Sequence, residues 1–135
     1  MAKYIKWFLV ILLLPVLLLV LIIIGNTVLN SFYLWKFEKQ LYNYPLPSGA
    51  KILKKNSNIG VLMGNGNHCD FIAYVELETS KSILDIEEHY KNMTILPALS
   101  NRAQQGFIIE PVSQGVIKVK IWDAPNSSNF DLRCT

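Results

Sequence analysis

Charged side chains are almost missing from the first part of this sequence. No Asp, Glu, Lys or Arg lies between Lys6 and Lys36, and residues 7–24 consist almost entirely of Leu, Val and Ile. At about 1.5 Å per residue, a helix of this length spans roughly 30 Å, the thickness of the hydrocarbon core of a bilayer. A helix buried in a soluble domain normally keeps a polar face, and this segment has none. The gap in charge therefore predicts a transmembrane helix.

The sequence also lacks the features that would mark this segment for removal. A cleaved signal peptide has a shorter apolar core, of about 7 to 15 residues, followed by a cleavage site of small residues. Residues 25–30 read GNTVLN, with no Ala-x-Ala pattern and no cysteine that could carry a lipid. We therefore predict an uncleaved signal anchor over residues 1–35, which contacts the lipid bilayer through residues 7–29.

Basic residues are few, and their positions bear on orientation. Lys3 and Lys6 precede the apolar run, whereas Lys36 and Lys39 follow it. The first pair favours a cytoplasmic N-terminus by the positive-inside rule, and the second pair opposes it. The predicted location is the cell membrane, as a single-pass protein with its N-terminus cytoplasmic and its C-terminal domain extracytoplasmic.

Basic residues and cysteines are also few, and this limits which partners and cysteine states the chain can have. The net charge is only +3, and residues 51–55 hold the only basic cluster, so no nucleic acid is predicted as a partner. The two cysteines, Cys69 and Cys134, can form a disulfide or remain thiols, and the sequence leaves both states open. No cofactor is predicted.

After the anchor, the spacing of apolar residues predicts that the helix continues and then stops. Phe37 and Leu41 lie at helical spacing, and Pro45 and Pro47 end the helix because proline lacks the amide hydrogen and crowds the preceding residue. We interpret residues 36–48 as a juxtamembrane helix end and a proline-bounded neck.

Residues 49–135 form the predicted domain, in which apolar residues mostly alternate with polar ones. Ser82 is a suitable N-cap for a helix with Asp85 in its first turn, and Pro111 suggests an edge strand. Asn56-Ser57-Asn58 indicates a bulge or turn within the first strand region. The predicted fold class is α+β, with a transmembrane helix followed by a small four-stranded antiparallel sheet and one packed helix in the order β-β-α-β-β. The expected strands cover residues 52–63, 69–78, 107–112 and 115–122, and the expected inward residues are Phe71, Ala73, Val75, Leu77, Ile117, Val119 and Ile121.

A glycine- and asparagine-rich turn is the candidate contact site. Asn65-Gly66 predicts a type I′ hairpin turn, because both central positions need positive φ. A dinucleotide-binding loop is excluded because a third glycine is missing and a strand follows instead of a helix. Exposed amides of a turn can bind a polar ligand. The predicted ligand or partner contacts are Gly64, Asn65, Gly66, Asn67, His68 and Asp70.

The same region contains residue types found in metal and catalytic sites. His68, Cys69 and Asp70 are consecutive, and His89 lies on the predicted helix. Strand alternation, however, directs Cys69 away from His68 and Asp70, and no second cluster has ligand spacing. We therefore predict no metal site and no catalytic residue, with Cys69 as a small buried side chain and His89 as a shield on the helix surface.

Three stretches together carry a resemblance to a known group. FEKQLYNYPLP follows the anchor, GVLMGNGNHCDF covers the predicted turn, and FDLRCT lies near the end. They resemble a group of uncharacterised small single-pass membrane-anchored proteins of Gram-positive bacteria, with the GNGN-x-x-DF run as the most specific part. The resemblance implies location and organisation, and it implies no activity.

The leading functional hypothesis is a surface-exposed binding or interaction module, with a larger membrane protein as its partner. One alternative is a small cell-envelope enzyme that uses Cys69, His68 or Asp70. Another is an immunity-type protective membrane protein. The sequence contains no catalytic signature that decides in favour of an enzyme.

Overall fold

The computed structural model describes residues 2–62, 69–99, 104–124 and 131–134 of the chain. It confirms the α+β layout, in which a long apolar helix precedes a four-stranded antiparallel sheet with one further helix. The elements in chain order are α1 (Ala2–Tyr42), β1 (Lys51–Gly60), β2 (Asp70–Glu78), α2 (Ile83–Tyr90), β3 (Gln104–Ser113), β4 (Val116–Ala124) and the short 3₁₀ helix η1 (Leu132–Cys134).

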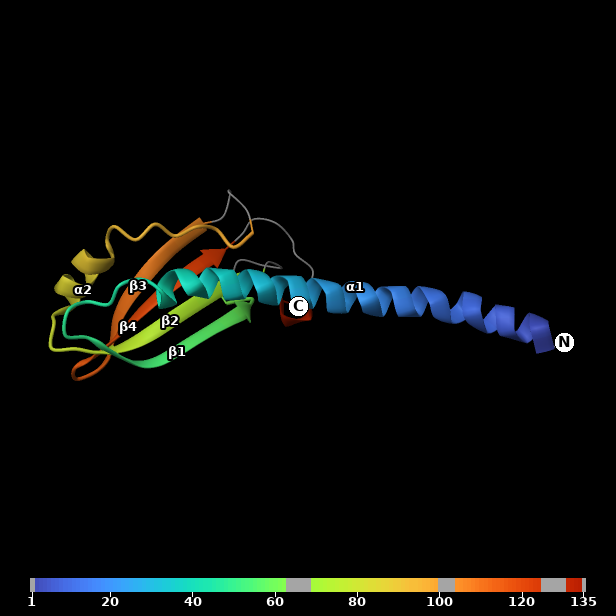
Figure 1. Cartoon of the computed structure of the whole chain (residues 1–135), viewed down its shortest axis with the longest axis horizontal. Helices are drawn as coiled ribbons and strands as arrows, with labels where there is room; N and C mark the ends of the chain where they lie inside the picture. Colours follow the sequence, from blue (N-terminus) through green and yellow to red (C-terminus); the bar gives the residue numbers. More distant parts are fainter. Residues whose placement is uncertain (1, 63–68, 100–103, 125–130, 135) are drawn as a thin grey trace.

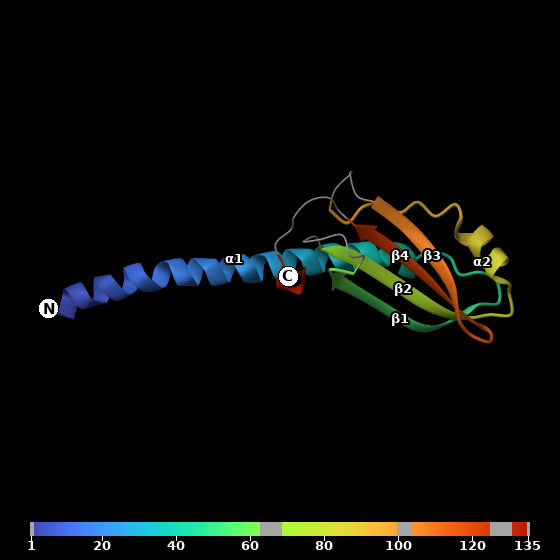
Figure 2. The ribbon, with the colours of Figure 1, turned by 180° about the vertical axis from the view of Figure 1, so that it is seen from behind.

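The first half of α1 extends well beyond the domain, whereas its second half lies along the sheet (Figure 1, and from behind in Figure 2). The helix continues through Pro15 without a break. Within the described residues, Ile11–Tyr42 is long and apolar enough to cross a membrane, with a mean hydropathy of 2.8. Nothing else in the described chain covers its apolar part.

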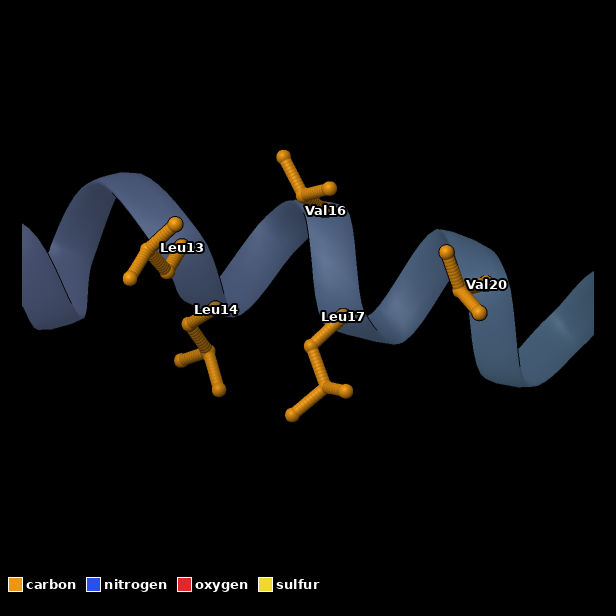
Figure 3. A pocket seen from close by; sticks show the side chains of 5 residues that line it. All are labelled: Leu13, Leu14, Val16, Leu17 and Val20. Atoms are coloured by element: carbon orange, nitrogen blue, oxygen red, sulfur yellow. The ribbon is translucent and has the colours of Figure 1, made fainter.

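A shallow hollow of about 490 Å³ lies on this bare part of α1. Figure 3 shows that its lining side chains are hydrocarbon only and point in different directions around the helix. A hollow on an isolated apolar helix is a surface suited to acyl chains, and it has no polar group that could orient a ligand. The lining residues are Leu13, Leu14, Val16, Leu17 and Val20.

The strands lie in the order β1-β2-β4-β3, and every neighbouring pair is antiparallel. The pairing places β1 and β3 at the two edges. Pro111 lies on β3 next to a register shift between Pro111 and Ser113, as expected for a residue that cannot donate to the ladder.

One face of the sheet forms the core with α1 and α2. The predicted inward rows of β2 and β4 are confirmed, because every member is at most 6% exposed. The Phe37 ring of α1 lies 6.4 Å from the Phe71 ring, and Ile86 and Tyr90 of α2 join the same core. Ser82 and Asp85 form the reciprocal capping box that starts α2. Phe37 and Leu41, placed from the sequence in the juxtamembrane helix end, are 0% and 2% exposed and belong to this core.

The prediction of a bulge or turn at Asn56-Ser57-Asn58 is wrong. β1 is continuous through these residues, and its register shift lies between Ile52 and Lys54. The Asn56 and Asn58 side chains accept hydrogen bonds from the next backbone N–H groups, those of Ser57 and Ile59, at 3.0 and 2.9 Å. Asparagine therefore satisfies backbone donors of an edge strand here, which the pattern of turn-forming residues did not indicate.

The connection between β1 and β2 is longer than the predicted hairpin. Gly60 pairs with Asp70 as the last step of the ladder, whereas a two-residue turn at Asn65-Gly66 would carry the pairing on to Gly64 and Asn67. Val61, Leu62 and Cys69 are described and are not in strands. The type of turn at residues 64–67 lies outside the described residues and stays a prediction.

Candidate functional site

Segments that are far apart in the sequence meet beside the middle of α1. β1 and β4 end there, β2 begins there, and η1, next to the C label in Figure 1, lies against the helix. A disulfide joins Cys69, just before β2, to Cys134 in η1, and both residues are at most 4% exposed. We call this region the junction and define it by Asn30, Cys69, Asp131, Arg133 and Cys134. The disulfide answers the question that the sequence left open.

An ion pair between the exposed Arg133 and the buried Asp131 fastens η1 to α1. The Arg133 guanidinium donates to both Asp131 carboxylate oxygens, at 2.9 and 2.7 Å. Asn30 Nδ2 donates to Asp131 at 3.0 Å, and Arg133 Nη2 reaches the carbonyl oxygen of Thr27 at 3.2 Å. The hydrogen bonds from Arg133 hold the pKa of Asp131 well below its ordinary value, so this carboxyl group stays ionised.

Two more aspartates are buried near the same end of the sheet. Asp70 accepts a hydrogen bond from the backbone N–H of Leu62 at 2.8 Å, and Asp123 accepts one from that of Ala98 at 2.6 Å. Burial raises the pKa of Asp123 to about 6, the Ala98 N–H opposes that shift, and the charge of Asp70 adds to it. Each of these two carboxylates thus holds a segment of backbone in place, which is a structural role.

The structure describes one of the six predicted contact residues. Gly64, Asn65, Gly66, Asn67 and His68 lie outside the described residues, so their role stays a prediction. Asp70 is described and is 1% exposed, with its carboxylate turned to the Leu62 amide.

Of the residues considered for catalysis, the structure describes Cys69, Asp70 and His89, and His89 lies apart from the other two, whereas His68 lies outside the described residues. Cys69 is bonded to Cys134, and a disulfide sulfur cannot act as the thiolate that nucleophilic catalysis needs. His89 lies on α2, towards the other end of the sheet (Figure 1), where its Nε2 and the carbonyl oxygen of Pro45 are 2.7 Å apart. Across the described ranges, no group of three or more His, Cys, Asp or Glu side chains is placed to hold a metal ion.

The sheet face opposite α1 and α2 is open and carries an ordered pattern of side chains. Lys118 pairs with Glu76 at 3.9 Å and with Glu110 at 3.5 Å. The ammonium groups of Lys118 and Lys54 lie 5.2 and 6.0 Å from the centre of the Tyr74 ring. Ion pairs and cation–π contacts therefore hold the side chains at the centre of this face in place.

A hollow of about 250 Å³ lies on this open face. Lys120 forms no ion pair with any residue in the described part of the chain, so its charge can serve an external group. Amide, aromatic and cationic groups together suit recognition of a polar partner surface, and they supply no nucleophile or general base. The lining residues are Asn56, Asn58, Leu62, Ile72, Tyr74, Glu110, Lys118 and Lys120.

Gly106 contributes to the same face, and sequence reasoning missed it. A Cβ atom at Gly106 would lie 2.9 Å from atoms of the Trp122 indole, its cross-strand neighbour, which is too close for a real contact. The Trp122 ring therefore lies over Gly106. A glycine inside a strand is the available signal, because it often marks a close approach.

No protein-family model, curated protein or solved structure matches this chain. The resemblance to membrane-anchored proteins of Gram-positive bacteria therefore stays a prediction. The three segments that carry it nevertheless lie near one another where they are described, since Phe37 contacts Phe71 and Cys69 is bonded to Cys134.

Proposed function

We propose that this protein is a single-pass membrane protein that holds a small, non-enzymatic binding domain on the extracytoplasmic side of the cell membrane. The first half of α1 is the anchor, and the domain begins within the second half of the same helix. Exposure of apolar side chains around residues 11–24 supports the anchor, because such a surface is stable only in an apolar solvent.

The Cys69–Cys134 disulfide is the observation that carries the proposed orientation. Disulfides persist in oxidising compartments and are rare in the cytosol, where thiols are kept reduced. The lysines before the apolar run favour the same arrangement, with the N-terminus inside. Both features support a domain outside the cytoplasm.

The open sheet face supports binding as the role of the domain. Its centre is held by ion pairs, and Lys120 offers a cation that no described side chain neutralises. The proposed partner is a second membrane or surface protein. Its acidic patch would lie at the same distance from the membrane as the open sheet face. The predicted turn at residues 64–67 and the proline-bounded segment at residues 45–47 are further proposed contacts.

Topology is tested with a reporter attached after Thr135 that is active on only one side of the membrane. We expect activity outside the cytoplasm, an uncleaved chain, and a shift in gel mobility on reduction. A reporter active only in the cytoplasm would contradict the proposed orientation, and a cleaved chain would contradict the anchor.

Partner binding is tested by crosslinking in membranes and recovery of the protein. We expect Lys120→Glu to reduce recovery of the crosslinked partner, because it reverses the charge of the hollow. The matched control is Lys91→Glu on α2, which makes the same charge change at an exposed pair with Glu88. Equal recovery from both variants would count against the open face, and variants of Asn65 and Asn67 then test the predicted turn.

A further inference from the structure

Apolar side chains are exposed at the junction end of the domain, close to α1. Val61, Leu62 and Leu132 are 44%, 38% and 58% exposed. Gly60, which directly precedes Val61 and Leu62, lies against η1. A Cβ atom built on Gly60 would be 3.2 Å from the backbone carbonyl oxygen of Arg133 in η1. We call Val61, Leu62 and Leu132 the apolar rim; Leu62 also borders the hollow on the open sheet face, so the two surfaces adjoin at this residue.

Hydrogen bonds fix the height of this rim along α1. Asn30 binds Asp131 at 3.0 Å, and the Thr27 carbonyl oxygen accepts from Arg133 at 3.2 Å, so η1 lies level with residues 27–30. An anchor over residues 7–29 rises about 34 Å at 1.5 Å per residue, close to the thickness of the hydrocarbon core. The rim therefore lies where the hydrocarbon meets the headgroups.

The surface of α1 is also apolar and exposed at this level. Val28, Leu29 and Phe32 are 62%, 53% and 52% exposed at the same height. The polar groups that η1 brings to this level are neutralised internally, because Arg133 and Asn30 satisfy the Asp131 carboxylate. An element with paired charges and outward aliphatic side chains can enter the interfacial layer without leaving a charge unpaired in lipid.

We propose that Val61, Leu62 and Leu132 form a second membrane contact, so that the domain rests in the headgroup layer of the bilayer. The occupant of the rim is lipid, because η1 is held at the height where the anchor leaves the hydrocarbon. This inference rests on the anchor proposed above. It adds that the junction end of the domain is itself immersed.

The test uses the full chain in lipid nanodiscs, with the methyl groups of leucine and valine labelled for NMR. Lipids with a nitroxide near the top of the acyl chain broaden nearby methyl signals, and a water-soluble paramagnetic chelate broadens those in contact with solvent. We expect the Leu62 and Leu132 signals to lose most of their intensity with the labelled lipid and little with the chelate. Leu84 on α2, 74% exposed and far from the junction, is the control and should respond in the opposite way.

Leu17 in the anchor separates failure of this inference from failure of the anchor. If Leu17 broadens with the labelled lipid while Leu62 and Leu132 respond only to the chelate, the anchor stands and the rim contact is overturned. If Leu17 also fails to respond to the lipid, the anchor itself is wrong. The variants Leu62→Ala, Leu132→Ala and Leu84→Ala are used only to identify which methyl signals belong to these residues. The broadening itself is measured on the wild-type protein.

Discussion

At the scale of single residues, the buried aspartates have opposite electrostatic environments. Asp131 is neutralised by Arg133, whereas Asp123 lies beside the charge of Asp70 and receives one backbone hydrogen bond in the described structure. The second carboxylate oxygen of Asp123 has no hydrogen-bond partner within the described residues. Relative to an exposed aspartate, the surroundings of Asp131 therefore stabilise its ionised form, whereas those of Asp123 stabilise its protonated form.

The raised pKa of Asp123 predicts how stability depends on pH. An unfolded Asp titrates near pH 3.9 and folded Asp123 near about 6, so its contribution is fully present below about pH 4 and is lost as the pH rises through 6. Asp123→Asn keeps an acceptor for the Ala98 N–H and removes the charge. We expect this variant to be about 2 kcal/mol more stable than the wild type at pH 7.5 and to show little change between pH 5 and 7.5.

The measurement is urea unfolding of both proteins in detergent at pH 5 and 7.5. Glu87→Gln, an exposed acid on α2, controls for the loss of one negative charge and should leave the pH dependence as in the wild type. A wild type whose stability rises across this range would contradict the assignment to Asp123. The lowered pKa of Asp131 acts below about pH 4 and does not overlap this window.

The ion pair at the junction predicts an asymmetry between single and double substitutions. Arg133→Met leaves the Asp131 charge buried without its main partner, and we expect it to cost about 2–3 kcal/mol, since the guanidinium side chain is 35% exposed. Arg133→Met combined with Asp131→Asn should cost less than Arg133→Met alone. Unfolding free energies of the wild type, both single variants and the double variant check this, and additive costs would show that the two side chains do not interact.

At the scale of elements, α1 combines an exposed apolar rod with a core helix. Phe37 is fully buried against Phe71, whereas Trp35, two positions earlier, is 51% exposed. The second half of α1 therefore has one face in the core and one face exposed. Its last turns belong to the sheet domain as much as any strand does.

Phe37→Ala should destabilise the domain strongly. Removing a buried phenylalanine costs about 3–5 kcal/mol, whereas an exposed substitution such as Trp35→Ala should stay within about 0.5 kcal/mol. The check is thermal unfolding of both variants in detergent. If both variants unfold at the same temperature, the second half of α1 does not belong to the core.

Much of the sheet could be predicted, because alternation directly encodes which side chains turn inward. The rows through Phe71 and Ile117 and the capping box at Ser82 are local signals, and the structure confirms them. Pro111 indicated its edge strand for the same reason, since a missing amide is a local property. These features require no knowledge of distant contacts.

The junction could not be predicted, because it depends on contacts between residues far apart in the sequence. Cys69 and Cys134 are separated by 65 positions, and Asn30 and Asp131 by 101. Nothing in the local sequence around Asn30 points to a partner so far along the chain. The polar run within β1 reads as a turn because asparagine satisfies backbone groups in turns and, as here, on an exposed strand edge.

At the scale of the whole molecule, the sheet domain depends on the helix that carries it. A polypeptide of residues 26–135 keeps Asn30, Phe37 and Leu41, and we expect it to fold with its disulfide formed. A polypeptide of residues 49–135, the domain boundary expected from the sequence, lacks all three and should remain sensitive to protease. Limited proteolysis with mass analysis under non-reducing conditions distinguishes the two, and equal resistance would show that α1 is dispensable.

Because α1 runs from its apolar half into the core without an intervening linker, the domain cannot swivel independently of the proposed anchor. Transmembrane helices tilt to match their hydrophobic length to the local thickness of the bilayer. Any such tilt is passed on undiminished, so the open sheet face would lean by the same angle and turn about the same axis as the helix. The composition of the surrounding lipid would then set the direction in which that face looks along the membrane.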